Sequence, residues 1–203
     1  LPSPDASAHQ RGPVPPAPTA VIGIDLGLKE CATASDAQKL VGRWYRQEEK
    51  RLAKAQRANK KARVRALHAK IANRRKDEMH KFSTAMVKNC GAIFVGDVAS
   101  AKLVKTKMAK STLDAGWSML KTMLEYKSQQ AGVVFEVVDE SHTTQTCSCC
   151  GIIPASSPKG RADLRIRAWT CSECGAVHDC DVNAAKNILA AGLRRLGEGI
   201  SVL

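Results

Sequence analysis

Short apolar runs alternate with long stretches of helix-forming residues along this chain. Three runs near its beginning, separated by turn-like residues, predict a meander of short strands: VIGIDLG at 21–27, ECATASD at 30–36 and KLVGRW at 39–44. From Gln47 to Asn89 the chain contains no Pro or Gly, and its apolar residues recur at helical spacing. This stretch is too long for one ordinary helix, so we predict two helices with a break near Asn59–Lys61.

The second half of the chain predicts further strands and helices. Gly91 is expected to end the preceding helix, and the apolar run AIFVGDV at 92–98 predicts a buried strand. Residues 112–132 predict an amphipathic helix with a glycine as its C-cap, because apolar residues recur every three or four positions. VVFEVVDE at 133–140 predicts another strand, and a last helix is expected to begin at Asp181. Long helices around a mixed sheet indicate an α/β architecture.

The first apolar run contains a carboxylate that needs a partner. Asp25 stands in a stretch that otherwise reads as the middle of a buried strand. A buried carboxylate costs several kcal/mol unless it is paired, hydrogen-bonded or bound to a cation. The flanking Gly23 and Gly27 leave room for another group to approach the backbone closely.

The charge of the chain indicates a polyanionic partner. Its 203 residues carry a net charge of +13 at pH 7, and the pI is about 9.6, which favours nucleic acid over a membrane surface. No apolar run approaches the roughly 18–20 residues that span a bilayer. Residues 1–20 are rich in Pro and Ala and are expected to form a flexible linker or a truncated remnant. Without an apolar signal core, the eight cysteines favour a cytosolic protein with reduced or metal-bound thiols.

Four of the cysteines have the spacing of a zinc site. They form two CxxC pairs with twenty residues between the pairs, and a glycine follows each pair: Cys147, Cys150, Cys171 and Cys174. Two such pairs bring four thiolates to one tetrahedral zinc ion, which is then structural because no coordination position remains open. Cys149 could compete within the first pair, but the spacing favours it as a bystander.

A second aspartate could belong with Asp25. Asp181 stands at the start of the last predicted helix, where it could serve as an N-cap. Carboxylates from distant segments can also hold two Mg²⁺ ions about 3.5–4 Å apart in a site that cleaves phosphodiesters. Such ions would neutralise Asp25.

The order of these motifs resembles the C-terminal half of TnpB proteins, the RNA-guided nucleases of insertion sequences that are related to Fanzor proteins and type V CRISPR effectors. The resemblance covers residue 21 to the end and rests on these stretches: VIGIDLG, RKDEMHKFST, KSTLDAGWSMLKTMLEYKSQQAG, TTQTCSCCG, WTCSECG and DVNAAKNIL. It implies a transposon-encoded DNA endonuclease that acts with a guide RNA on target DNA in the bacterial cytoplasm, at the nucleoid.

The resemblance also implies a fold and its divisions. The fold is an RNase H-like (RuvC) mixed sheet with flanking helices, interrupted by a small zinc ribbon that handles target nucleic acid. We expect the nuclease body at 21–143, with a basic helical insertion at about 47–90. The zinc ribbon is expected at 144–177 and the final helix at 178–203. In this scheme Asp25 and Asp181 are the first and third catalytic carboxylates and bind Mg²⁺, and the four cysteines bind Zn²⁺.

The second carboxylate of the family is missing from its usual position. The family carries Glu in the central strand, whereas this chain has Gly96 there, and Asp97 should point to the opposite face of the sheet. Some members of the wider family move this glutamate to the strand before the zinc ribbon. Here that strand ends FEVVDE, so Glu140 is the preferred replacement, Glu136 is the second candidate, and Asp139 lies between them.

Two departures leave other functions open. The missing glutamate could make the chain a nuclease-inactive module that binds nucleic acid, as a repressor would, or a decayed fragment. Cys180 stands where the family usually has Arg, and His178 is expected to be structural rather than a general base.

The predicted helical insertion is strongly basic. Fifteen Lys or Arg residues lie between Arg43 and Lys81 against four acids, so these side chains either contact phosphates or form a solvated face. The candidates for nucleic-acid binding, here and in the loop at 99–111, are Arg57, Lys60, Lys61, Arg63, Arg74, Arg75, Lys105 and Lys107.

Overall fold

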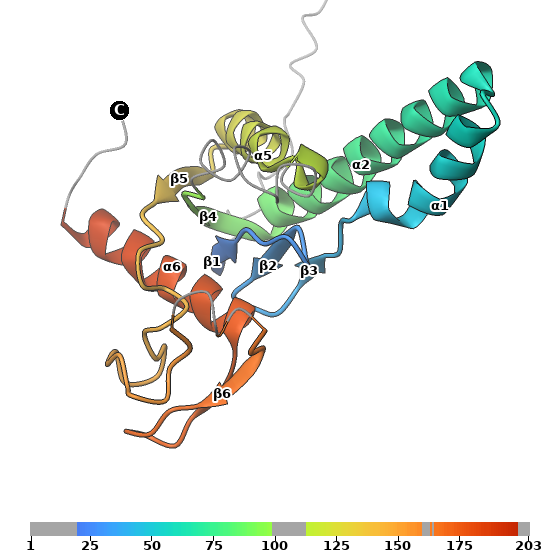
Figure 1. The fold of residues 1–203 in the computed structure, drawn as a ribbon. Coiled ribbons are helices and arrows are strands. Elements are labelled where there is room, and N and C mark those ends of the chain that lie inside the picture. The colour runs from blue at the N-terminus through green and yellow to red at the C-terminus, as the bar shows by residue number, and fades with distance from the viewer. Residues whose placement is uncertain (1–19, 99–112, 160–162, 164, 199–203) are drawn as a thin grey trace, which may run out of the picture.

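A computed structural model describes residues 20–98, 113–159, 163 and 165–198 of the chain (Figure 1). Residues 1–19, expected to be a linker, and the loop at 99–111 lie outside the described residues. The elements, in chain order, are β1 (Ala20–Asp25), β2 (Ala32–Ala34), β3 (Lys39–Leu40), α1 (Trp44–Arg57), α2 (Lys61–Asn89), β4 (Cys90–Gly96), α5 (Trp117–Ala131), β5 (Val134–Val138), β6 (Ala168–Thr170), β7 (Val177–Asp179) and α6 (Cys180–Gly197).

The element boundaries confirm most of the expectations and correct three of them. The break between the first two helices falls at Asn59, where φ is 51°. Gly91 does not end α2, because the chain already pairs with β1 from Cys90 onward. The helix predicted over 112–132 is interrupted: residues 113–115 are helical, but Gly116 has a φ of 63°, and α5 begins after it at Trp117. The last helix begins at Cys180 rather than Asp181.

The central sheet is mixed, in the order β3-β2-β1-β4-β5. Strands β1, β4 and β5 are parallel, whereas β2 and β3 are antiparallel to their neighbours. Because the carboxyl ends of parallel strands meet at one edge, residues that follow β1, β4 and β5 come together there. The mixed α/β architecture predicted from the sequence is confirmed.

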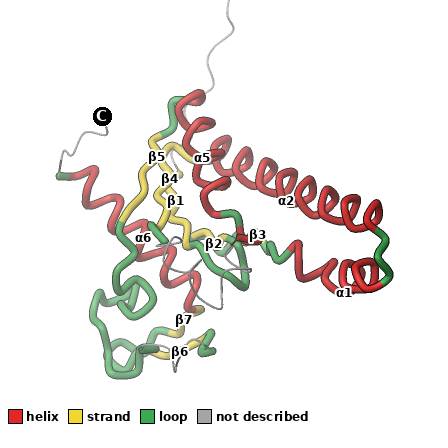
Figure 2. The backbone as a smooth tube through the Cα atoms, turned by 45° about the horizontal axis from the view of Figure 1, so that its top comes forward, coloured by secondary structure: helices red, strands yellow, loops and turns green. Residues whose placement is uncertain are grey.

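Helices cover both faces of the sheet (Figures 1 and 2). On one face, α2 and α5 pack on Ile22 and Ile24 of β1 and on Ile93 and Val95 of β4 to form the main core. On the other face, α6 packs on a smaller core that contains Ala92, Phe94, Val138 and Ile188. Asp25 has the strand parity of the α6 face, because it lies two residues beyond Gly23.

The close approach that the glycines of the first strand predicted is made by α6. A Cβ atom built on Gly23 would lie 2.2 Å from the carbonyl oxygen of Ala185. Any larger side chain at this position would push α6 away from β1. Gly23 therefore fixes the distance between the strand that ends in Asp25 and the helix whose first turn contains Asp181.

The α1 and α2 helices form a hairpin that projects from the body (Figures 1 and 2). It has a small core of its own, in which Leu52, Ala55 and Leu67 are buried. Lys70 of α2 also pairs with Glu48 of α1 at 2.9 Å. The hairpin is thus held together by contacts between its two helices and not only by the main core.

Candidate active site and metal centre

Three carboxylates from distant parts of the chain line one cleft at the carboxyl edge of the parallel strands. Asp25 ends β1, Glu140 follows β5 by two residues, and Asp181 lies in the first turn of α6. They line a cleft of about 420 Å³, called the acid cleft below. The expectation that Asp25 and Asp181 share one site therefore agrees with their positions.

Asp25 is the most strongly perturbed of the three. Its carboxyl group is buried, and burial together with the nearby Asp181 and Glu140 raises its pKa from 3.8 to about 8, against a smaller opposing effect of Arg167. Asp25 is therefore mostly protonated at neutral pH in the absence of a cation. The three carboxylates have too few positive charges nearby to balance them. A bound cation would offset their mutual repulsion and the cost of burying them.

Glu140 occupies the space toward which position 96 points. A Cβ atom built on Gly96 would lie 3.1 Å from Glu140 Oε2 and 2.9 Å from Cδ1 of Ile188 on α6. A side chain at position 96 would thus project toward the place where the Glu140 carboxylate already lies. Burial, and secondarily Asp97, raises the pKa of Glu140.

Three neighbouring acids, Glu136, Asp139 and Asp97, do not line the acid cleft. Glu136 pairs with Arg195 of α6, at 2.6 Å between Oε1 and Nε. Asp139 accepts hydrogen bonds from the backbone N–H and the hydroxyl of Ser141 and lines a different groove. Asp97 pairs with Lys121 of α5 at 3.0 Å, toward the helix layer opposite α6, as strand alternation predicts.

Asp181 is not the N-cap of the last helix. That role belongs to Asp179, whose Oδ1 accepts hydrogen bonds from the backbone N–H groups of Asp181 and Val182. The carboxylate of Asp181 is therefore free of capping, and its Oδ1 pairs with Nη1 of Arg167 at 3.2 Å. Burial raises the pKa of Asp181, and Arg167 opposes this effect.

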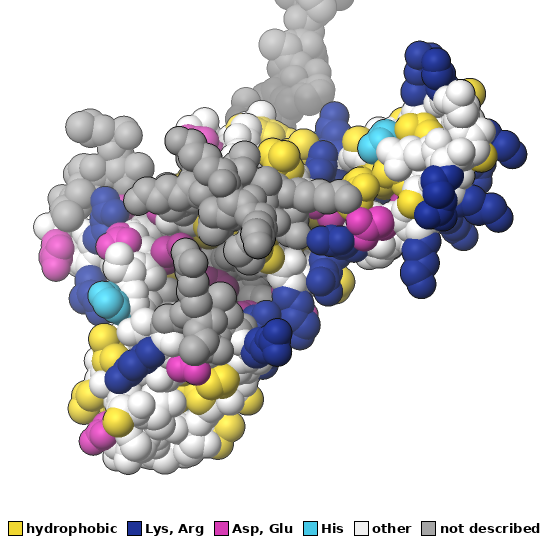
Figure 3. Space-filling view, in the orientation of Figure 1, with side chains coloured by type: hydrophobic (Ala, Val, Ile, Leu, Met, Phe, Trp, Pro, Cys, Tyr) yellow, Lys and Arg dark blue, Asp and Glu magenta, His cyan; other side chains and the backbone are white. Residues whose placement is uncertain are grey.

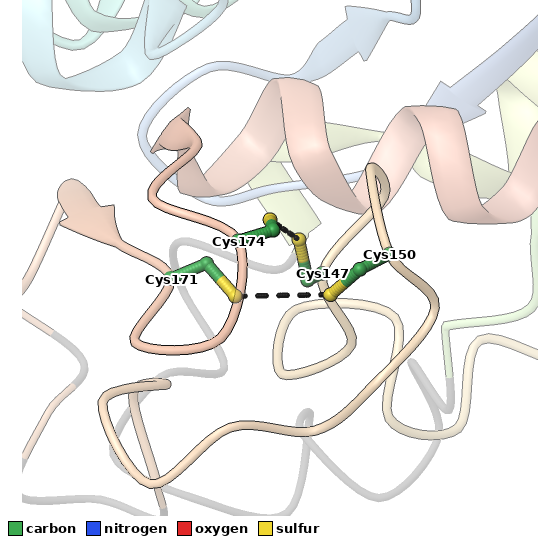
Figure 4. Close-up of side chains that lie close together, drawn as sticks. All are labelled: Cys147, Cys150, Cys171 and Cys174. Carbon is green, nitrogen blue, oxygen red and sulfur yellow. Dashed lines mark hydrogen bonds between the residues drawn. The ribbon is translucent and has the colours of Figure 1, made fainter.

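The four cysteines of the two CxxC pairs converge (Figure 4). Their sulfur atoms all lie within 4.8 Å of one another, with 3.7 Å between Cys147 and Cys174 and 3.8 Å between Cys150 and Cys171. A tetrahedral zinc ion with Zn–S bonds of about 2.3 Å requires sulfur–sulfur distances of about 3.8 Å. The thiolates therefore fit zinc. Cys149 is exposed and is not part of the set, as predicted.

The surroundings of Cys147 favour its thiolate, whereas the pKa of Cys174 is raised to about 12: the backbone N–H of Ala176 opposes the rise, and burial and the neighbouring cysteines cause it. Burial alone would raise the pKa of Cys147, but the backbone N–H groups of Cys150 and Cys149 and the side chain of His178 bring it down to about 6. His178 Nε2 lies 3.0 Å from the Cys147 sulfur, and its ring packs on Trp169 with 4.7 Å between the ring centroids. The contacts of His178 are thus structural, and it does not line the acid cleft.

Two asparagines of α6 bind the segment that leads from β5 to the first CxxC pair. The side-chain amides of Asn183 and Asn187 each donate to the carbonyl oxygens of Thr143 and Thr146, at 2.7 to 3.2 Å. Asn183 Oδ1 also accepts from the backbone N–H of Ser148, the residue after Cys147. Sequence reasoning missed this pair, although amides four residues apart on a helix do share one face.

The two candidate metal sites differ in how closely their ligands approach one another. Among the described residues, only the four cysteines form a set of His, Cys, Asp or Glu ligand atoms close enough to surround one ion. The carboxylates of the acid cleft line the same space, but their oxygen atoms are farther apart than the four sulfur atoms are. Their oxygen-only donor set is the type that Mg²⁺ and Mn²⁺ bind, so the residues fit a divalent cation of that class.

The predicted nucleic-acid-binding residues divide into two groups. Arg57, Lys60, Lys61 and Arg63 surround the turn at the tip of the α1–α2 hairpin, where Lys and Arg side chains gather (Figure 3). Arg74 and Arg75 already make contacts within the chain. Arg74 binds Glu78 and Gln47, whereas Arg75 binds the Leu113 carbonyl and pairs with Asp114. Lys105 and Lys107 lie outside the described residues.

None of the described helices has the length and apolar composition that a membrane crossing requires.

Two family models match the sequence. One, OrfB_IS605, is described as a probable transposase and matches residues 6–107, which is half of the chain. The other is a Cas12f1-like TNB domain and matches residues 117–188, a range that includes α5, all four zinc-site cysteines and Asp181. The chain belongs to the TnpB family. Mimivirus proteins named TnpB-like are 27% identical to it over 138 residues, 64% of this chain and 25% of theirs.

Curated relatives of this TnpB-family chain are about twice as long. A putative RNA-guided DNA endonuclease of Streptomyces pristinaespiralis is 42% identical over 202 residues, which cover 91% of this chain and 49% of that protein. The putative RNA-guided DNA endonuclease InsQ of Escherichia coli K12 is 29% identical over 209 residues, 89% of this chain and 50% of that one. The chain thus spans about half the length of the curated relatives that it matches.

A solved structure shares the fold. The protein of a Cas12f1–sgRNA–target DNA complex superimposes with a TM-score of 0.63 at 21% identity, over 86% of this TnpB-family chain and 50% of that chain. At this identity the likeness concerns the fold alone.

Proposed function

We propose that this chain is the nuclease part of a transposon-encoded, RNA-guided DNA endonuclease of the RuvC type. The observation that carries the proposal is the convergence of Asp25, Glu140 and Asp181 on one cleft, although they are far apart in the sequence. The raised pKa of Asp25 supports it, because burial of uncompensated acids costs stability and is retained where it serves a function. We expect the two divisions at 21–143 and 144–177 to act as nuclease body and zinc ribbon.

Each carboxylate has a role in the proposed two-metal site. Asp25, Glu140 and Asp181, which line the same cleft, would together hold the divalent cations. Bound Mg²⁺ supplies an activated water and stabilises the leaving oxygen. The contribution of the chain is to hold three carboxylates on rigid elements, β1, the turn after β5 and the N-terminus of α6.

Glu140 replaces the missing central glutamate in this proposal. The support is that a side chain at position 96 would project to the carboxylate of Glu140, so that a glutamate from either strand would deliver oxygen atoms to the same region. Glu136, the second candidate, is engaged with Arg195. Asp97 is engaged with Lys121.

The proposed partners are target DNA and guide RNA. The net charge of +13 and the basic tip of the α1–α2 hairpin support a polyanionic partner. Relatives of this chain are named RNA-guided DNA endonucleases, and a related fold was solved with an sgRNA and target DNA. We propose that the protein acts in the bacterial cytoplasm, at the nucleoid.

The proposal is tested by cation-dependent cleavage of single-stranded DNA. Cutting in Mg²⁺ or Mn²⁺ should fall at least 100-fold in Asp25→Asn, Asp181→Asn and Glu140→Gln, because each removes one ligand carboxylate. Asp139→Asn is the matched control, since this neighbour of Glu140 lies in another groove and should cut at the wild-type rate. Cutting that survives Asp25→Asn would refute the site, and a loss in Glu136→Gln but not in Glu140→Gln would transfer the role to Glu136.

A nuclease-inactive nucleic-acid-binding module is the second candidate function. Gly96 favours it, as does the open spacing of the acids, since only the four cysteines among the described residues form a closed ligand set. This alternative predicts salt-dependent binding of DNA or RNA with no cation-dependent cutting. Cleavage that Glu140→Gln abolishes would rule it out.

A further inference from the structure

The loop that follows Asp25 is held from the side of the sheet opposite to α6. Residues 26–31, called the cleft loop below, begin with Leu26 and Gly27, which line the acid cleft next to Asp25. The indole N–H of Trp117, the first residue of α5, donates a hydrogen bond to the carbonyl oxygen of Gly27 at 3.1 Å. Trp117 is buried in the main core together with Leu26. It therefore contacts the cleft loop without lining the cleft itself.

The cleft loop turns tightly and depends on contacts from outside. The N–H of Gly27 donates to the carbonyl oxygen of Cys31 at 3.3 Å, and a Cβ atom built on Gly27 would lie 2.8 Å from the carbonyl oxygen of Glu30. Glycine permits this close approach, but it also leaves the backbone more conformational freedom than any other residue. A partly buried carbonyl oxygen that loses its donor moves toward another one, because leaving it unpaired is costly. Such a movement of Gly27 would also displace Asp25, two residues before it.

The segment that leads into α5 is itself fixed at two points. The carbonyl oxygen of Ala115 accepts a hydrogen bond from the thiol of Cys31 at 3.0 Å, so this segment also holds the far end of the cleft loop. Both carboxylate oxygens of Asp114 accept from the backbone N–H of Tyr45, in the first turn of α1, at 3.0 Å. Trp117 thus belongs to a segment that connects the base of the α1–α2 hairpin with both ends of the cleft loop.

We propose that Trp117 is a positioning residue of the acid cleft, whose indole N–H holds the cleft loop in the conformation in which Asp25 binds a divalent cation. The inference rests on the proposed function. Trp117 acts through Gly27 and not on the cation, because it does not line the cleft. Loss of the indole N–H therefore weakens cation binding and leaves the binding of nucleic acid as it is.

Trp117→Phe tests this role, because it removes the indole N–H and keeps an aromatic ring in the core. The Mn²⁺ concentration for half-maximal binding, measured by electron paramagnetic resonance, should rise about three- to tenfold, the range expected for one hydrogen bond. The Mn²⁺ concentration for half-maximal cleavage of single-stranded DNA should rise by the same factor. The KM for the DNA at saturating Mn²⁺ should stay at the wild-type value. A smaller folded fraction lowers the amplitude of both Mn²⁺ titrations but does not move their midpoints.

Trp44→Phe is the matched control. Trp44 is also buried, but its indole N–H donates to Oε2 of Glu78 at 2.7 Å, at the base of the hairpin, instead of to the cleft loop. This variant should keep the Mn²⁺ midpoints of wild type. Zinc content and the urea midpoint are measured for both variants, so that a loss of folding is recognised.

A second measurement uses the wild-type protein. The chain contains three tryptophans, so the protein labelled with ¹⁵N-tryptophan gives three indole N–H signals, which Trp44→Phe and Trp169→Phe assign. When Mg²⁺ is added, the signal of Trp117 should shift with the midpoint of cation binding, and the signal of Trp44 should stay. Asp25→Asn should abolish the shift of Trp117.

The outcomes separate this inference from the proposed function. If wild type binds Mn²⁺ and Asp25→Asn does not, the metal site stands. The role of Trp117 is then refuted if Trp117→Phe keeps the wild-type Mn²⁺ midpoint, if Trp44→Phe raises this midpoint as much, or if the Trp117 signal does not respond to Mg²⁺. If Asp25→Asn binds Mn²⁺ as wild type does, the proposed metal site itself is wrong.

Discussion

Replacing Asp25 by Asn should stabilise the folded protein in the absence of divalent cations. Asn has nearly the same shape as a protonated Asp, but it does not ionise. The pKa of Asp25 is raised from 3.8 to about 8, chiefly by burial and then by Asp181 and Glu140. Between these values the unfolded chain has released the proton and the folded chain has not. The wild-type protein therefore loses stability as the pH rises through this window, whereas Asp25→Asn does not.

The size of the effect follows from the pKa shift. A pH of 7 is about 3 units above the ordinary pKa of the carboxyl group, so this group is ionised in the unfolded chain, whereas in the folded chain it is still mostly protonated. At about 1.4 kcal/mol per unit, the free energy of unfolding of Asp25→Asn should exceed that of wild type by up to about 4 kcal/mol. The difference should nearly vanish at pH 4 and should grow by about 3 kcal/mol between pH 5 and pH 7.

The assay is urea denaturation of the zinc-loaded protein at pH 4, 5, 6 and 7, in buffers prepared without Mg²⁺, Mn²⁺ or other free divalent cations. An m value of about 2 kcal/mol per M converts the effect at pH 7 into a midpoint shift of about 1–2 M urea. Asp139→Asn is the control of opposite sign. Hydrogen bonds from Ser141 lower the pKa of Asp139, so its replacement should slightly destabilise the protein above the ordinary Asp pKa.

Two results would contradict this reasoning. If Asp25→Asn were less stable than wild type at pH 7, the buried carboxylate would have a favourable partner, and the electrostatic argument for a cation site would fail. Mn²⁺ provides the second comparison: at 100 times its dissociation constant, a cation that binds only the folded state adds about 2.7 kcal/mol. Wild type should gain this stability and Asp25→Asn should not. An equal gain in both would locate the ion elsewhere.

Two further predictions concern the ribbon and the hairpin. Chelation of zinc should abolish hydrogen-exchange protection across residues 144–178 while α1 and α2 keep theirs, because the hairpin has its own core; loss of protection in both would mean a single cooperative unit. Lys60→Glu combined with Arg63→Glu at the hairpin tip should weaken binding to nucleic acid and reduce the slope of log K against log salt by about 1.5–2. Lys88→Glu, at the far end of α2, should leave this slope unchanged in the same titration.

The sequence predicted the elements and the grouping of the four cysteines because these depend on local patterns. Hydrophobic periodicity marks the strands and helices, and the α1–α2 break follows from the length of the uninterrupted stretch. The paired CxxC spacing identified the four thiolates correctly, since chain geometry within each pair brings two sulfurs together. Asp25 was recognisable as a candidate because a carboxylate in an apolar run is costly by itself.

The contacts that orient the site could not be predicted from local patterns. Asp179 and Asp181 are only two residues apart, and either could cap a helix. Which of them does so depends on where α6 begins in the folded protein, and the local sequence does not define this point. The amides of Asn183 and Asn187 gain their partners only when the segment after β5 passes over α6. Arg167 likewise reaches Asp181 through the fold and not through sequence proximity.

The relation between Gly96 and Glu140 supports our proposal that Glu140 takes the place of the central glutamate. Strands β4 and β5 are parallel neighbours, in register from Ala92 with Val134 to Gly96 with Val138. Their carboxyl ends therefore lie at the same edge, and a side chain two residues beyond Val138 can reach over the end of β4. A Cβ at position 96 would lie 3.1 Å from the Glu140 carboxylate and 2.9 Å from the end of the Ile188 side chain, so glycine there leaves both side chains where they lie. In our proposal the carboxylate that is missing at position 96 is supplied from the segment after β5, and glycine at the end of β4 leaves room for it.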